Sequence, residues 1–205
     1  MILCLLKRPN WPPSALANPA VIPAKAGIQA SYNISMKPLV IFMAGSTAAG
    51  KTQMAHYLSE EFSLPIFSTD SIRYDTKVDK DEININEIVE DFHAARKTRG
   101  DAMFERGKSF ICDGSVDRDW DDRKKAAEEA GFDWLLIDFD LSRERIMKNR
   151  KLFDRIENDE LFDRWIAEHQ KFHETSDQDA QLHITDDNYG HRYQLAEKLV
   201  KKALK

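Results

Sequence analysis

The segment from Gly45 to Thr52 constrains this sequence most, because it matches the pattern G-x-x-x-x-G-K-[ST] in full. An apolar run, Leu39 to Ala44, precedes it, and apolar residues at helical spacing follow it. A buried strand, a glycine-containing turn and a helix in this order form the context in which the pattern binds phosphate. Glycines let backbone N–H groups approach phosphate oxygens, and the helix N-terminus adds a positive dipole. We therefore predict a phosphate-binding loop here.

Within this loop Lys51 is expected to reach the β- and γ-phosphates of a nucleotide, and the hydroxyl of Thr52 is expected to bind Mg²⁺. The backbone of the whole loop is expected to surround the phosphates. The residues predicted to bind the nucleotide are Gly45, Ser46, Thr47, Ala48, Ala49, Gly50, Lys51 and Thr52.

Apolar runs and helical periods alternate along the chain after residue 36. Strands are predicted at 39–44, 65–68, 109–112, 134–139 and 181–185, and helices at 53–62, 81–106, 123–130, 142–150 and 193–204. A turn is predicted at Asp113-Gly114, after the third strand, because Asp-Gly is a common turn pair. Strands separated by helices indicate an α/β fold with a parallel sheet, and the continuous apolar run 39–44 indicates a central strand buried on both faces.

Residues 1–35 differ in composition from the rest of the chain, since they hold five of the seven prolines and no Asp or Glu. Their apolar start is too short for a signal peptide. Residues 21–29 resemble translated intergenic repeats of some bacterial genomes. We expect 1–35 to be a disordered extension or a misassigned start, with Met36 as the true start, and 36–205 to form one domain.

The charge and cysteine content exclude several classes of protein. The chain has 30 Lys and Arg against 35 Asp and Glu, and this net charge of −5 disfavours a general nucleic-acid binder. No apolar run reaches the roughly 18 residues that a membrane-spanning helix needs. Two cysteines, Cys4 and Cys112, do not make a disulfide framework, so we expect a cytoplasmic protein. The oligomeric state stays open.

With this loop and this order of elements, the chain resembles the P-loop kinases, and among them the nucleoside-monophosphate-kinase-like group of small phosphotransferases. The resemblance spans residues 37–200. It implies a P-loop NTPase three-layer sandwich with a five-stranded parallel sheet, helices on both faces and a helical lid. It also implies ATP and Mg²⁺ as cofactors. Many members have a further glycine at the position of Ala48, so the loop backbone is expected to be slightly less free here.

The segment from Ser68 to Arg73 follows the second strand, at the sheet edge where doubly wound folds bind ligands. Asp70 can take a proton from an acceptor hydroxyl, and Arg73 can hold an anionic group beside it. This D-x-x-R arrangement is similar to that of polynucleotide-end kinases and zeta-type toxin kinases, and the segment also resembles part of phosphoglycerate-type kinases. Alternatively, Asp70 only caps the next helix. Arg118 is a further candidate for the acceptor site.

Mg²⁺ usually takes one or two carboxylates, and the resemblance implies that Asp113 holds it through water beside Thr52. Asp138 and Asp140, at the end of the fourth strand, are competing candidates. Residues 143–175 resemble the lid region of these kinases, whose arginines close over the triphosphate. The predicted catalytic arginines are Arg150 and Arg155, and the alternatives are Arg143, Arg145 and Arg164.

His169 and His173 are four residues apart on an expected helix, so both could face one metal ion. The Glu that accompanies such a pair in H-E-x-x-H is absent between them, which argues against a zinc site of that type.

The favoured function is an ATP- and Mg²⁺-dependent kinase that transfers the γ-phosphoryl group to a small metabolite carrying a hydroxyl or phosphate. Residues 75–105 are the expected acceptor-binding insertion, and their acidic composition disfavours a nucleic-acid end as acceptor. Two alternatives stay open: a regulatory P-loop NTPase without a small-molecule acceptor, and a toxin-type or nucleic-acid-end kinase. The identity of the acceptor and the choice between ATP and GTP are not readable from these residues.

Overall fold

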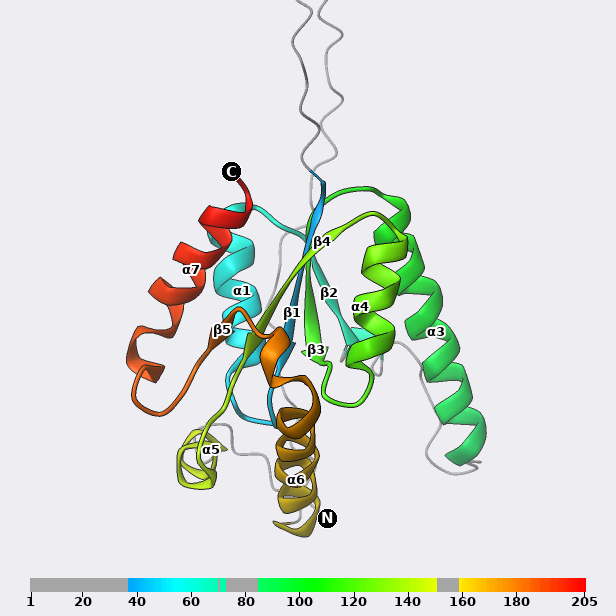
Figure 1. Cartoon of the computed structure of the whole chain (residues 1–205). Helices are drawn as coiled ribbons and strands as arrows, with labels where there is room; N and C mark the ends of the chain where they lie inside the picture. Colours follow the sequence, from blue (N-terminus) through cyan, green and yellow to red (C-terminus); the bar gives the residue numbers. More distant parts are fainter. Residues whose placement is uncertain (1–36, 70, 73–84, 151–158) are drawn as a thin grey trace, which may run out of the picture. The chain divides into compact units, whose positions relative to one another are not determined.

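The structure is a computed structural model that describes residues 37–69, 71–72, 85–150 and 159–205. Five strands form one sheet in these residues: β1 (Leu39–Ala44), β2 (Ile66–Ser68), β3 (Phe110–Ser115), β4 (Asp133–Asp138) and β5 (Leu182–His183). They lie in the order β2-β3-β1-β4-β5, and each neighbouring pair is parallel (Figure 1). The predicted parallel sheet with a central first strand is confirmed.

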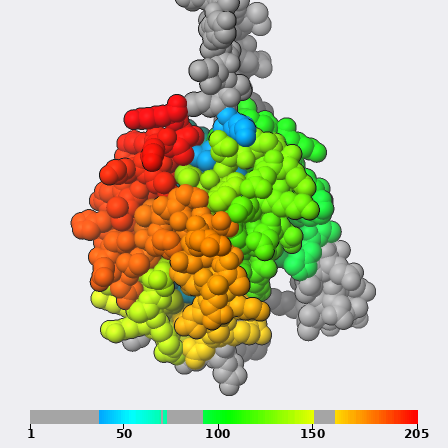
Figure 2. Space-filling view, viewed as in Figure 1, coloured from blue at the N-terminus to red at the C-terminus, as the bar shows by residue number. Residues whose placement is uncertain are grey.

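Helices cover both faces of this sheet, because parallel strands need crossover connections. α1 (Lys51–Phe62) and α7 (Arg192–Ala203) lie on one face, and α3 (Ile85–Glu105) and α4 (Trp120–Glu129) lie on the other (Figure 1). α5 (Arg143–Arg150) and α6 (Asp159–Ser176) lie near the carboxyl edge. In Figure 2 the residues that follow α6, coloured orange, lie between α7, coloured red, and α4, coloured green. Among the described helices, none is long and apolar enough to cross a membrane.

Alternate residues of β1 point to opposite faces of the sheet and join a separate hydrophobic cluster on each side. Ile41 belongs to the same buried cluster as Met54 and Leu58 of α1. Phe42 packs on the other face against Trp120 of α4, with ring centroids 5.6 Å apart in an edge-to-face arrangement. Burying each such side chain stabilises the fold by about 1.5–3 kcal/mol. These two clusters hold the end of β1, and hence the loop after it, in place.

The predicted turn at Asp113-Gly114 is wrong, since both residues lie within β3. Asp113 is paired with Ser68 of β2, so the strand continues past the expected turn. Gly114 permits this pairing because a Cβ atom there would lie 2.5 Å from Oγ1 of Thr69. The glycine therefore serves close packing of two strands, and this pairing carries the Asp113 carboxylate to the sheet edge.

Two other elements differ in length from their predictions. α4 begins at Trp120 rather than at residue 123, because the indole is buried and its Nε1 donates to Asp179 at 2.7 Å. β5 contains only Leu182 and His183. The side chain of Asn188 ends this strand by accepting from the Thr185 N–H at 2.9 Å and donating to the His183 carbonyl at 2.9 Å.

The thiol of Cys112, in β3, is predicted to be almost unreactive in the folded protein. Its side chain is 2% exposed, and burial raises its pKa to about 11. We expect a Cys4→Ser variant to react with a disulfide reagent at pH 8 at least ~100-fold more slowly when folded than in denaturant, because the thiolate is the reactive form. Reagent absorbance against time measures both rates. Equal rates would contradict the buried position of Cys112.

Candidate active site

The loop Gly45–Thr52 connects β1 to α1 at the carboxyl edge of the sheet. Gly45 has φ 134° and Gly50 has φ 107°, which are conformations that favour glycine. Ala48 has φ 60° and is one of two non-glycine residues with positive φ among those described. Such a conformation costs an alanine about 1–2 kcal/mol. The loop therefore holds an alanine where many P-loop kinases have a glycine, at the cost of some backbone strain.

The ammonium group of Lys51 lies over its own loop. Nζ donates to the carbonyl oxygens of Gly45 at 2.6 Å and Ser46 at 2.7 Å. The first turn of α1 contains no acidic side chain, so its N-terminal dipole also favours an anion. Loop, lysine and helix together form a positive site suited to phosphate groups.

Thr52 and Asp113 come together although 61 residues separate them. The Thr52 hydroxyl donates to Oδ1 of Asp113 at 3.0 Å, and Ser68 donates to Oδ2 at 3.4 Å. The carboxylate is 7% exposed and lies at the start of α1. Hydroxyl and carboxylate oxygens are the donors that Mg²⁺ accepts, so these two residues fit the ion. Asp138, one of the competing candidates, instead contacts histidines of α6 and β5.

Asp117 accepts a hydrogen bond from the loop backbone, and the sequence did not identify it as a site residue. Its Oδ1 accepts from the Gly45 N–H at 2.9 Å. Burial opposes its ionisation, but His169, the charge of Lys51 and the Ser115 hydroxyl outweigh burial and hold its pKa at about 2. A permanent anion thus fixes the first glycine of the loop. The residue lies 72 positions from Gly45 in a charged stretch, so no local pattern indicates it.

The last turn of α5 contacts the loop through Asn149. Its side-chain amide donates to the Ala48 carbonyl at 3.1 Å and to the hydroxyl of Tyr189 at 3.0 Å. Tyr189 belongs to the short helix η2 (Tyr189–His191). The guanidinium of the neighbouring Arg150 lies over the ring of Phe162, 4.7 Å from its centroid. The start of the predicted lid region therefore lies against the loop.

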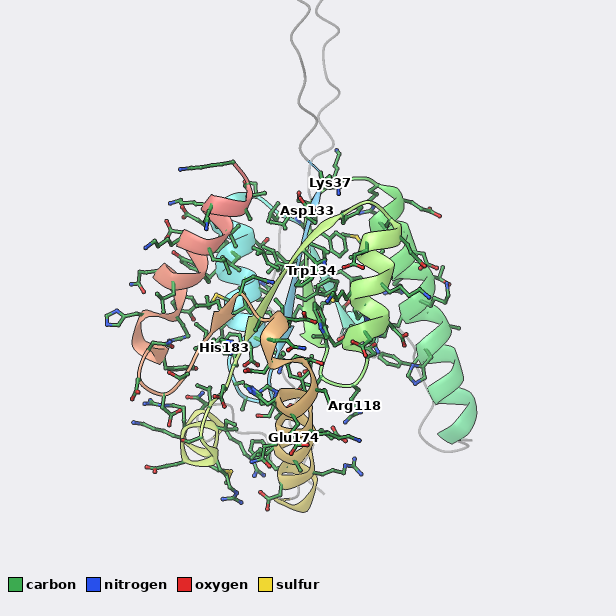
Figure 3. All side chains as sticks on the ribbon, in the orientation of Figure 1. Lys37, Arg118, Asp133, Trp134, Glu174 and His183 are labelled. Atoms are coloured by element: carbon green, nitrogen blue, oxygen red, sulfur yellow. The ribbon has the colours of Figure 1, made fainter. Side chains whose placement is uncertain are left out.

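Several predicted site residues have carboxylate neighbours or lie outside the described residues. Arg118 donates through Nε to Glu168 of α6 at 2.8 Å and lies beside this helix (Figure 3). Arg143 donates to Asp163 at 2.8 Å. The alternatives Arg145 and Arg164 are 4.0 Å from Asp186 and Glu168, respectively. The predicted base Asp70, the acceptor-binding Arg73 and the catalytic Arg155 lie outside the described residues.

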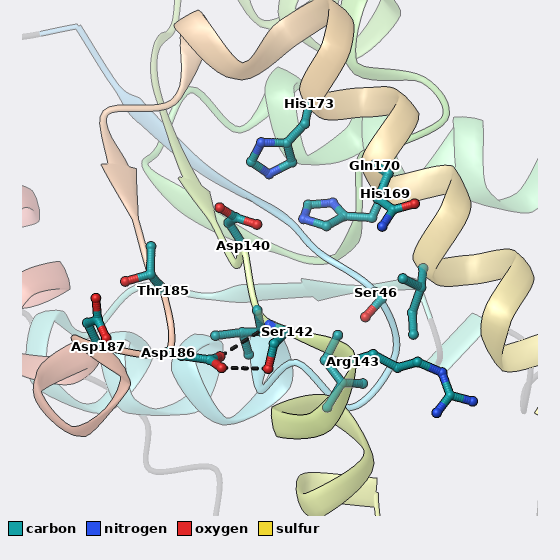
Figure 4. Close-up of a pocket in the computed structure, with 13 residues that line it drawn as sticks. Ser46, Asp140, Ser142, Arg143, His169, Gln170, His173, Thr185, Asp186 and Asp187 are labelled. Atoms are coloured by element: carbon teal, nitrogen blue, oxygen red, sulfur yellow. Dashed lines mark hydrogen bonds between the residues drawn. The ribbon is translucent and has the colours of Figure 1, made fainter.

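A pocket of about 670 Å³ opens beside the loop (Figure 4). Ser46 lines it from the loop, and α6 and the segment after β5 contribute its other walls. Ser142 closes one side by donating to Asp186 at 2.5 Å. Its polar lining residues are Ser46, Asp140, Ser142, Arg143, His169, Gln170, His173, Thr185, Asp186 and Asp187.

Comparison with known proteins places this geometry in a family and a fold. The model of the zeta toxin family matches residues 24–138, which is more than half of the chain. No curated protein matches the sequence.

Solved structures share the fold at low sequence identity. A shikimate kinase from Bacteroides thetaiotaomicron matches with a TM-score of 0.54 and 17% identity over 80% of this chain and 98% of that one. An APS kinase from Mycobacterium tuberculosis matches with a TM-score of 0.50 and 11% identity over 80% and 98%. A chain of the Pnkp1/Rnl/Hen1 RNA repair complex matches with a TM-score of 0.59 and 18% identity over 71% and 48%. The fold is therefore that of the P-loop kinases.

Proposed function

Since this chain belongs to the zeta toxin family, we propose that it is a kinase that transfers the γ-phosphoryl group of ATP to a small hydroxyl- or phosphate-bearing acceptor. The observation that carries the proposal is the 3.0 Å contact between the Thr52 hydroxyl and the Asp113 carboxylate, beside a complete phosphate-binding loop. A nucleoside triphosphate needs a loop that binds its phosphates, and its Mg²⁺ needs oxygen ligands such as this hydroxyl and this carboxylate.

In this proposal the loop N–H groups and Lys51 hold the phosphates, and Thr52 and Asp113 hold Mg²⁺. When bound, Mg²⁺ neutralises charge on the β- and γ-phosphate oxygens. Lys51 exchanges its contacts with the Gly45 and Ser46 carbonyls for contacts with phosphate oxygens, which gives stronger, charge-assisted hydrogen bonds. Positioning and charge stabilisation are the main contributions of a protein to phosphoryl transfer.

The acceptor is proposed to bind at the segment that follows β2. β2 ends at Ser68, whose hydroxyl already contacts Asp113, so the chain enters this segment beside the proposed Mg²⁺ position. Asp70 is proposed to accept the proton of the acceptor hydroxyl, and Arg73 and Arg118 to bind its anionic groups. Arg150 and Arg155 are proposed to stabilise the charge of the transferred phosphoryl group, with Asn149 keeping the end of α5 against the loop.

A toxin-type kinase is the second candidate, because the family match favours it over a regulatory NTPase. It shares the proposed chemistry and differs in its biological target. Growth of a bacterial culture after induced expression distinguishes the two roles: a toxin stops growth, and an Asp70→Asn variant restores it.

The test of the proposed reaction is ³¹P NMR of the purified chain with ATP, Mg²⁺ and pools of sugars, glycerate-type acids, nucleosides and nucleotides. We expect a new phosphoester signal with one pool. Asp70→Asn should lower its rate by roughly 10²–10⁴-fold, as loss of a general base does, without weakening ATP binding. Asp133→Asn, an exposed carboxylate at the start of β4, serves as control. Release of phosphate with every pool, unaffected by Asp70→Asn, would support a regulatory NTPase instead.

A further inference from the structure

Three of the six histidines converge on one buried carboxylate, at the end of β4 and outside the proposed kinase machinery. The carboxylate is Asp138, which is 0% exposed. His169 and His173 reach it from α6, and His183 reaches it from β5. In Figure 4 the rings of His169 and His173 project from α6 toward the same space beside the pocket.

The atoms of this cluster are close but poorly aligned for hydrogen bonds. Nε2 of His173 lies 2.8 Å from Oδ2 of Asp138, and Nε2 of His169 lies 3.5 Å from Oδ1. Within the described part of the chain, Asp138 Oδ1, Nε2 of His173 and both ring nitrogens of His169 are buried without a hydrogen-bond partner. Leaving buried polar atoms unpartnered costs about 1–3 kcal/mol each. A bound ion removes this cost by using the same lone pairs.

The separations are close to those of ligands around one metal ion, although the 2.8 Å between His173 Nε2 and Asp138 Oδ2 is shorter. Bonds of about 2.0–2.1 Å in a tetrahedral site place ligand atoms roughly 3.4 Å apart. The ligand atoms of Asp138, His169 and His173 all lie within 4.8 Å of one another, and the His169 to Asp138 separation is 3.5 Å. The four-residue spacing on α6 presents both imidazoles to one side of the helix.

The outer contacts of the two imidazoles repeat an arrangement found around metal-binding histidines. Nδ1 of His169 lies 3.2 Å from Oδ2 of Asp117, and Nδ1 of His173 lies 3.1 Å from Oδ1 of Asp177. A carboxylate at Nδ1 favours the tautomer whose Nε2 lone pair is available to a metal. His183 contacts Asp138 Oδ2 through Nδ1 at 3.1 Å and so orients the carboxylate. Asp138 and His173 thus each have an orienting partner, and His169 has a carboxylate neighbour at Nδ1 without an aligned hydrogen bond.

We propose that Asp138, His169 and His173 bind one divalent transition-metal ion, Zn²⁺ by their donor set, separate from the Mg²⁺ position at Thr52 and Asp113. Two imidazoles and one carboxylate form a three-ligand zinc set that leaves a fourth position open. His169 and His173 also line the pocket, so this position faces it. The ion would fix α6 to β4. Because His169 also contacts Asp117, which accepts from the Gly45 N–H, the ion would also connect α6 to the loop.

The test uses the full chain without a histidine tag, stripped with a chelator and titrated with Co²⁺ as a spectroscopic probe in the absence of nucleotide. We expect one Co²⁺ per chain, intense visible d–d absorption typical of four- or five-coordination, and displacement by Zn²⁺. His173→Ala should weaken binding at least ~100-fold, and Asp177→Asn roughly 10–100-fold, as an outer contact does. His191→Ala, at an exposed histidine of η2, should leave the spectrum unchanged.

Further variants separate this site from the loop and from misfolding. The His173 side chain is 22% exposed, so its replacement is expected to leave the far-UV circular dichroism unchanged. Asp113→Asn should also leave the Co²⁺ spectrum unchanged. The proposal is overturned if the wild-type chain binds no stoichiometric Co²⁺ or Zn²⁺, if folded His173→Ala binds as tightly as the wild type, or if Asp113→Asn abolishes the spectrum.

Discussion

Lys51→Ala is expected to lower the rate of phosphoryl transfer by roughly 10²–10⁴-fold, within the range seen when one charged or hydrogen-bonding group at a transition state is removed. The ammonium group already lies within 2.7 Å of two loop carbonyls, so it is held over the loop that we propose binds the phosphates. Its loss removes a positive charge at the place where negative charge develops. The core below the loop does not include this side chain, so the fold should persist.

Single-turnover transfer followed by ³¹P NMR or by separation of labelled product measures this rate. Lys125→Ala is the matched control, because Lys125 is an exposed lysine on α4, paired only weakly at 3.9 Å with Glu129. It should retain the wild-type rate. Transfer by Lys51→Ala at the Lys125→Ala rate would show that the loop does not bind the reacting phosphates.

Gly45→Ala is expected to destabilise the protein by about 2–6 kcal/mol, the sum of backbone strain and overpacking. Gly45 has φ 134°, and a Cβ atom there would lie 2.8 Å from Cβ of Phe139, which is fully buried. Because the neighbouring atom is close to the backbone just after β4, it has little freedom to move away. Urea denaturation followed by circular dichroism measures the change in unfolding free energy.

Gly107→Ala is the control that separates steric overlap of the added Cβ atom from the strain of a positive φ. Gly107 also has positive φ, at 60°, but no atom of the described residues lies within 4 Å of the position that an added Cβ atom would take. This change should cost only about 1 kcal/mol, since strain is partly offset by the lower entropy of the unfolded chain. Equal costs for the two variants would mean that contact with Phe139 does not restrict Gly45.

Local signals were sufficient for the loop and for the fold class. The apolar run of β1, the glycines at Gly45 and Gly50 and the helical period of α1 all act within a few residues, where backbone geometry depends on the residues themselves. The alternation of strands and helices then limits the sheet to parallel connections. The prediction of a turn at Asp113-Gly114 was wrong because a non-local interaction, the pairing of β3 with β2, outweighed the local turn preference.

The sequence alone therefore predicted the glycine-lysine loop after β1 and the parallel α/β architecture, whereas it left Asp113, Asp138 and Asp140 as competing partners for Thr52. Only the tertiary structure decided which distant groups support these elements: Asp117 on Gly45, Asn149 on Ala48, and Asp138 between His169 and His173. Such contacts join side chains many tens of residues apart, and they depend on how strands align and how helices pack. The spacing of His169 and His173 showed that both could face one ion, but the sequence argued against a zinc site, and only the fold placed Asp138 of β4 beside them.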